Sequence, residues 1–387
     1  MFVSKIESNR RILIRIATSL MVLIIGPSAA WAAMQLEGIV IYALVITYSK
    51  TIVAEIVAKS QEKSIIAYRY SPLILSLSGG VSILSDVWYV PVIIVPLLLG
   101  SFVGAYWNLF HALRNLYDIP VEEFQRNEIG ATVSAAILII LLKQIDIYHY
   151  ATFLGVLLPI ISFIAPMAKE STSSVLGKLT LEITSESHYQ AHLITGSYGI
   201  FSLLSTWCMR IFTLSVGGVT ALASYIAIAQ VIGHLAKTKI NVKAKDTDLH
   251  NWILGNRICQ SGLIIMSIGV LYLNPLIFGL GFFIKTAGST GFLRPLEVKF
   301  SEKLLTGEGG GLGVRERMKF KTQSKFITIL VTSFYFAKES NINLEILTLS
   351  YNQQILIILL GISFVASLLN IRILSHGNSH LYSRDMG

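Results

Sequence analysis

Long apolar runs separated by short polar connections dominate the pattern of this chain. Each run holds roughly 18 to 25 residues without strong charge, the length that an α-helix needs to cross the ~30 Å of hydrocarbon in a bilayer. The runs are continuous and do not alternate between apolar and polar positions, so they predict helices and exclude the strands of a membrane barrel. The expected spans are 11–33, 36–57, 70–86, 90–112, 129–147, 150–168, 192–214, 217–236, 254–273, 275–294, 324–341 and 353–373.

The composition supports the same class of protein. Of the 387 residues, 53% are hydrophobic and 14% are charged, whereas a soluble domain carries roughly a quarter charged residues. So few charges cannot cover a soluble globule of this length. We therefore expect an all-α polytopic membrane protein with about 12 transmembrane helices, surrounded by membrane lipid.

The formal net charge of +9 comes from basic residues scattered through the short connections. This distribution is typical of topology signals and does not indicate a nucleic-acid partner. With the N-terminus inside, most of these basic residues fall on the cytoplasmic side, and the opposite side keeps little more than Lys143 and Lys338. The pattern predicts an integral protein of the cytoplasmic (inner) membrane with both termini in the cytoplasm.

The first apolar segment has two interpretations. Arg10, Arg11 and Arg15 precede an apolar stretch that ends in Ser-Ala-Ala-Trp-Ala at 28–32, a pattern that also fits a cleaved signal peptide. An uncleaved first helix gives an even number of spans and lets the loop charges alternate correctly between the two sides. We therefore expect the segment to be the first span, with Arg15 as a topology signal.

Two parts of the chain are similar at an offset of about 180 residues. Ala58-Lys59-Ser60 follows the second span and Ala236-Lys237-Thr238 follows the eighth, while Arg114 and Arg294 end the fourth and the tenth. The shared offset predicts a duplicated six-helix unit with pseudo-twofold symmetry. Its expected parts are an N-terminal half at 1–168, a cytoplasmic linker at 169–191 and a C-terminal half at 192–387.

The two basic connections also resemble a family signature. The connection after the eighth span, Gly233-His234-Leu235-Ala236-Lys237, is similar to the weaker signature copy of the major facilitator superfamily, with Lys237 where the family usually has an acid. The connection after the second span, Ala54-Glu55-Ile56-Val57-Ala58-Lys59, lacks the glycines and the aspartate of the signature. Together with the two six-helix halves, the chain resembles a divergent member of this superfamily. The resemblance implies gating roles for Glu55, Lys59, Gly233 and Lys237, although Glu55 and Lys59 also have the spacing of a local salt bridge.

The resemblance further implies that the first, fourth, seventh and tenth helices line a central cavity. Lys285, midway along the tenth span with Ser289 one turn later, is the clearest charge inside an apolar run. Charge within hydrocarbon is costly and usually faces protein or water. Lys285 is therefore either a cavity cation that attracts an anionic solute or an interhelical partner. Arg210, on the seventh span, lines the cavity mouth or snorkels to the surface.

The fourth span carries the remaining candidate contacts with substrate. Gly100, Gly104, Trp107 and His111 fall on one helical stripe, and the two glycines predict close packing against another helix. Trp107, Asn108 and His111, at the inner half of the span, are candidate substrate-binding residues, with interfacial anchoring as the alternative.

These features predict a secondary active transporter that moves a small anionic or amphiphilic solute by alternating access, as a monomer without a cofactor. No paired acids or metal ligands indicate an enzyme. Cys208 and Cys259, the only cysteines, lie in apolar runs without metal-ligand spacing and predict buried thiols and no metal site. The alternative is a flippase of the multidrug and polysaccharide (MOP) type, exporting a lipid-linked or polysaccharide intermediate, because that group also has two six-helix halves.

Overall fold

The predicted all-helical fold is confirmed in the computed structural model. Its description covers residues 9–10, 12–21, 36–58, 61–83, 89–116, 121–144, 149–164, 218–243 and 248–293, with shorter stretches at 201–212, 320–332 and 358–368 of which some residues are described. Within these residues, every position is helical except the turn at 272–274.

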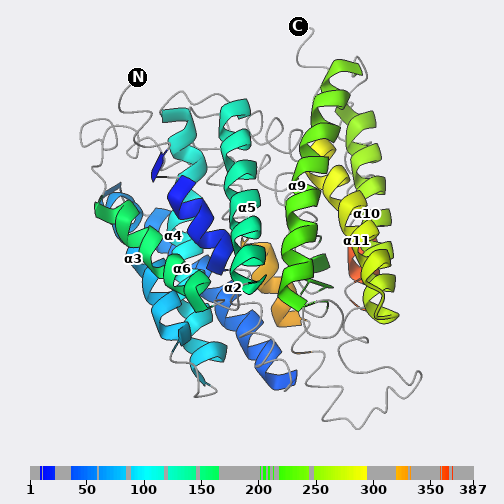
Figure 1. Ribbon diagram of the computed structural model, residues 1–387. Coiled ribbons are helices and arrows are strands. Elements are labelled where there is room, and N and C mark those ends of the chain that lie inside the picture. Colours follow the sequence, from blue (N-terminus) through cyan, green and yellow to red (C-terminus); the bar gives the residue numbers. More distant parts are fainter. Residues whose placement is uncertain are drawn as a thin grey trace, which may run out of the picture.

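The first part of the chain forms a bundle of helices (Figure 1). They are the helix Ile12–Met21, α2 (Leu36–Ala58), α3 (Gln61–Ile83), the π-helical turn η1 (Val90–Ile94), α4 (Val95–Leu116), α5 (Val121–Gln144) and α6 (His149–Ile164). Two of them begin earlier than predicted, α3 at Gln61 instead of 70 and α5 at Val121 instead of 129. The early turns of both helices are polar, so hydropathy alone does not mark them, although their backbone continues the helix.

The second part of the chain repeats this arrangement. It contains α9 (Gly218–Lys243), α10 (Asp248–Leu271), α11 (Pro275–Thr286), the π-helical segment η3 (Ala287–Leu293) and the helix 320–329. The predicted linker at 169–191 lies outside the described residues, so the division into halves at 168 and 192 stays a prediction, as does the count of twelve helices.

The hairpin between α10 and α11 is fixed by a helix cap. The Asn274 side chain accepts hydrogen bonds from the backbone N–H groups of Leu276 and Ile277, at 3.0 and 3.1 Å. Pro275 occupies the first turn, where its missing N–H costs nothing. Leu273 adopts a positive φ of 52°, which reverses the chain direction just before the cap. The turn therefore brings α11 back along α10.

Glycines let neighbouring helices approach closely. As predicted, Gly100 and Gly104 are packing positions, because a Cβ at either would overlap α2 at Ser49 or at the backbone of Lys50. In the second part, Gly262 on α10 lies against the backbone of Lys285 in the same way. Small residues of this kind are the usual means of close helix packing within a bilayer.

The two parts of the chain share one packing scheme. In the first, α4 packs on both α2 and α3; in the second, α11 and η3 pack on both α9 and α10. The two parts meet where α5 packs against α9, through small apolar side chains such as Ala135, Ala136, Ala223 and Ala229 (Figure 1).

Apolar side chains lie on the surface of the bundle as well as in its core, and several hydroxyl groups are buried among the helices. Ser71, Ser78 and Ser267 are fully buried, whereas Ile164 and Leu276 are 74% and 77% exposed. Outward-facing apolar side chains and inward-facing hydroxyl groups are expected when lipid is the solvent. Within the described part of the chain, the segments Ile253–Leu271 and Pro275–Leu293 are long and apolar enough to cross a membrane, and five further apolar helices are shorter.

Candidate functional site

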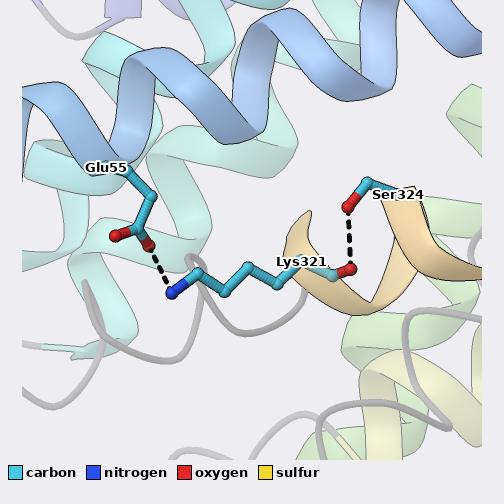
Figure 2. Close-up of polar contacts among 3 residues, drawn as sticks. All are labelled: Glu55, Lys321 and Ser324. Atoms are coloured by element: carbon cyan, nitrogen blue, oxygen red, sulfur yellow. Dashed lines mark hydrogen bonds and ion pairs between the residues drawn. The ribbon is translucent and has the colours of Figure 1, made fainter.

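An ion pair joins the first part of the chain to its last third. Glu55, in the final turn of α2, accepts a charged contact from Lys321 on helix 320–329, with 3.0 Å between Nζ and Oε1 (Figure 2). The side chains are 32% and 45% exposed, so solvent screens the pair. The Ser324 hydroxyl donates to the Lys321 carbonyl at 2.8 Å, one turn along the same helix. The pair therefore connects two helices that are far apart in the sequence.

Two further polar contacts lie along the same pair of helices. The Lys50 amine of α2 donates to the Gln323 side-chain oxygen and lies 5.0 Å from the centre of the Phe320 ring. The Tyr48 and Thr328 hydroxyl groups are hydrogen-bonded to each other. Residue numbers rise along α2 as they fall along helix 320–329, so the two helices run antiparallel.

We call this set of contacts the polar seam. It consists of Tyr48, Lys50 and Glu55 on α2 and of Lys321, Gln323 and Thr328 on helix 320–329. Gly104 of α4 packs behind it, against the backbone of Lys50. The seam is thus supported by tight backbone packing on one side and joined by hydrogen bonds and one ion pair on the other. Each of these polar contacts is individually weak and can exchange with water when it separates.

Lys285 lies near the end of α11 with its side chain half-buried. Its amine is 5.7 Å from the centre of the Phe282 ring, within cation–π range. Because Gly262 of α10 packs against its backbone, the position of Lys285 is set by the α10–α11 contact. Cys259 of α10 and Cys208 are free, buried thiols, as predicted.

Two other predicted residues have packing roles in the structure. Ser289 is buried on η3, and its hydroxyl donates to the carbonyl of Thr286 at 3.4 Å. Gly233 is buried on α9, where a Cβ would lie only 3.0 Å from the Cβ of Thr290. Gly233 therefore lets α9 approach η3 closely, and this contact gives a reason for a glycine at the position that the family signature occupies.

The remaining candidates are placed only in part. Trp107, Asn108 and His111 lie on α4 and Lys237 on α9, but their side chains are outside the described structure. Arg210 and Lys59 lie entirely outside it. The structure pairs Glu55 with Lys321, while the expected local partner Lys59 is not described. The roles predicted for these residues stay predictions.

The sequence interpretation missed two cations. Lys50 lies inside the predicted span 36–57, so the signal that singled out Lys285, a lysine within an apolar run, was present there too. Arg10 was considered only as part of a possible signal peptide, yet its side chain is only 1% exposed and lies against Tyr68. Both positions became conspicuous only when their partners were brought together by the fold.

The sequence matches no known family model and no curated protein. The structure, in contrast, is similar to solved transporters over nearly its whole length. A mutant form of the nucleoside transporter NupG aligns with a TM-score of 0.61 at 13% identity, covering 95% of this chain and 99% of that one. A bacterial homologue of the iron transporter ferroportin, in an inward-facing state, aligns with a TM-score of 0.60 at 13% identity, covering 96% and 98%. A POT family transporter in complex with 5-aminolevulinic acid aligns with a TM-score of 0.60 at 10% identity, covering 94% and 96%.

The similarity defines the fold of this protein. The chain has the fold of these membrane transporters, which agrees with the overall fold that the resemblance implied. Identities of 10 to 13% carry the fold and not the substrate. Such a fold places the chain among integral membrane proteins.

Proposed function

We propose that this protein is a secondary active transporter that moves a small anionic or amphiphilic solute across the cytoplasmic membrane by alternating access. It acts as a monomer with both termini in the cytoplasm. The observation that carries the proposal is the polar seam, in which α2 and helix 320–329 are joined by side-chain contacts within a transporter fold. We assign the seam as the gate on the side of the membrane where α2 ends.

The strength of the seam suits a gate. An ion pair with exposed side chains contributes about 0.2–1 kcal/mol, and a hydrogen bond within a membrane protein contributes about 0.6 kcal/mol on average. Three such contacts therefore favour the closed seam by about 1–3 kcal/mol. Polar contacts of this strength do not lock the seam by themselves, so a solute with different affinities for the two states can shift the balance.

The proposed solute class rests on Lys285. A half-buried amine on an apolar helix, held in place by the α10–α11 contact, is a fixed positive charge in surroundings of low dielectric. It attracts an anion, or the anionic group of an amphiphile, far more strongly than a lysine in water does. Similarity to major facilitator structures over more than nine-tenths of the chain favours this transporter over a MOP-type flippase.

The proposal is tested by solute uptake into proteoliposomes. Purified protein is given a panel of small anions and amphiphiles, and wild type is compared with Lys285→Ala, Lys285→Arg and the control Lys325→Ala, which removes an exposed lysine on helix 320–329. We expect wild type to accumulate at least one anionic member of the panel. Loss of one charge-assisted contact should lower uptake at subsaturating solute by about tenfold or more in Lys285→Ala.

The controls separate this role from a general loss of fold. Lys325→Ala should transport like wild type, and Lys285→Arg should retain more activity than Lys285→Ala because it keeps the charge. Equal transport of an identified anion by wild type and Lys285→Ala would remove Lys285 from the solute site. Uptake confined to cations would overturn the proposed solute class.

A further inference from the structure

Arg10 is a buried cation two residues before the helix Ile12–Met21. Its side chain is 1% exposed, and its guanidinium carbon lies 4.9 Å from the centre of the Tyr68 ring. In the part of the chain that the structure describes, none of its three guanidinium nitrogens has a hydrogen-bond partner. The tyrosine ring therefore covers the guanidinium, while its hydrogen-bond donors remain unmatched.

The ring below Arg10 is held by a stack of aromatic side chains. Tyr68 of α3 stacks on Tyr106 of α4 with 5.7 Å between ring centres and 11° between planes. Tyr106 in turn stacks on Phe102 at 5.3 Å and 15°. All three rings are fully or almost fully buried. Two helices thus build a rigid aromatic platform, and the guanidinium lies over its last ring.

The platform satisfies only part of what a guanidinium requires. Arginine stays charged in proteins, and its five N–H donors point outward in the plane of the group. A ring that lies over the guanidinium stabilises the charge through its face but accepts none of these hydrogen bonds. A buried charge without hydrogen bonds is strongly unfavourable, more so than one cation–π contact offsets.

The natural complement of a planar fork of donors is an oxyanion. Carboxylates and phosphates accept two parallel N–H···O bonds from arginine, and such pairs are strongest where water is excluded. Arg10 thus offers a positive charge and a planar set of donors, in surroundings that exclude water, to the same chemical group.

We infer that Arg10, over the Tyr68 platform, is a binding site for a carboxylate or phosphate group. Arg10 contacts the buried cluster that contains Tyr68 and Tyr106, whereas Lys285 packs against α10, whose Cys259 and Leu263 belong to the other cluster. The site is therefore separate from the proposed solute site and stands whether or not the protein transports anions. The oxyanion is either a soluble ion or the headgroup of an anionic lipid, since both present the same oxygens.

The test follows thermal unfolding of the full-length protein by tryptophan fluorescence. In zwitterionic detergent, inorganic phosphate and succinate are titrated at constant ionic strength. In nanodiscs, phosphatidylcholine alone is compared with phosphatidylcholine containing phosphatidylglycerol. The variants are Arg10→Met, Arg10→Lys and Arg257→Met, which makes the same change at an exposed arginine of α10. Intact mass of the purified protein shows whether residue 10 is retained.

We expect at least one probe to raise the unfolding midpoint of wild type and of Arg257→Met. Arg10→Met should bind that probe at least about tenfold more weakly. When no anion is present, this variant should unfold at or above the wild-type midpoint, because it removes a buried charge without hydrogen bonds. A response to phosphate or succinate identifies a soluble ion, and a response only to phosphatidylglycerol identifies a lipid headgroup.

Other results would overturn the inference. A purely structural arginine would make Arg10→Met less stable by the same amount with and without anion. Equal responses of wild type and Arg10→Met to every probe, or a purified chain that lacks residue 10, would also exclude the site. If Arg10→Met does not fold, Arg10→Lys decides, because it keeps the charge but loses the fork and must bind the probe more weakly than wild type.

Discussion

Neutralising Glu55 should loosen the polar seam by a small and calculable amount. The Glu55–Lys321 pair is well formed at 3.0 Å, but its side chains are 32% and 45% exposed. Pairs of this kind contribute about 0.2–1 kcal/mol. Glu55→Gln should therefore increase the ratio of open to closed seam by roughly 1.4- to 5-fold.

The change can be followed as the reactivity of a single cysteine. Ser324 is 7% exposed and lies one turn from Lys321, so Ser324→Cys reports whether the seam is open. The native thiols, Cys208 and Cys259, are fully buried and are replaced by alanine to remove background. The rate of alkylation by a small maleimide should rise roughly 1.4- to 5-fold when Glu55→Gln is added.

A charge swap distinguishes the ion pair from a general loosening. Glu55→Lys alone places like charges together and should speed alkylation more than Glu55→Gln does. Adding Lys321→Glu restores the opposite charges and should bring the rate back toward that of the parent. If the three proteins react at one rate, or if the double variant reacts faster than Glu55→Lys alone, then the pair does not hold the seam closed.

Two further predictions concern packing and can both be checked by unfolding in detergent. Gly262→Ala should lower the free energy of unfolding by about 1–3 kcal/mol, because the added Cβ meets the backbone of Lys285. The control Gly80→Ala, where a Cβ meets nothing within 4 Å, should leave the protein equally stable or more stable by up to about 1 kcal/mol, and equal effects of the two variants would refute the close approach. Tyr225→Phe removes a hydrogen bond of 3.0 Å to the carbonyl of Pro275 and should lower the free energy of unfolding by about 0.5–1 kcal/mol. Tyr225→Leu also removes the ring, which lies against Gly279 and Phe278, and should destabilise more; equal destabilisation by the two variants would contradict a packing role for the ring.

Among the helices that the structure describes, hydropathy predicted the long apolar ones well, because a helix in lipid must present an apolar length. The predicted spans 36–57 and 275–294 correspond closely to α2, Leu36–Ala58, and to α11 with η3, which end at Leu293. The starts of α3 and α5 were missed because a helix does not stop where the hydrocarbon does. Gln61 and Glu122 lie in first turns whose polar side chains suit the membrane interface.

The glycines of the fourth span show what spacing can and cannot predict. The four-residue interval between Gly100 and Gly104 predicted a close helix contact, and the structure confirms one. Nothing in that interval names the partner helix, because the partner depends on how the whole bundle folds. That the glycines pack on α2, behind Lys50, is information that only the fold supplies.

The polar seam lay beyond sequence reasoning for the same reason. Lys50 and Gln323 are separated by 273 positions, and Glu55 had a closer candidate in Lys59. A local i, i+4 spacing can be read from the sequence, whereas a contact between α2 and helix 320–329 depends on the three-dimensional fold. Arg10 illustrates a related limit: a charge count assigns it to one side of the membrane but cannot show that a tyrosine covers it.

The central claim, that the seam between α2 and helix 320–329 opens and closes, is tested most directly by a distance distribution between spin labels. Cysteines at Ile56 and Lys325, both exposed and close to the Glu55–Lys321 pair, carry the labels in protein whose native cysteines are replaced. We predict two distance populations in lipid. Glu55→Gln should increase the fraction of molecules with the longer distance, and a transported solute should change that fraction. A single distance, unchanged by Glu55→Gln and by every solute that the protein transports, would contradict the account.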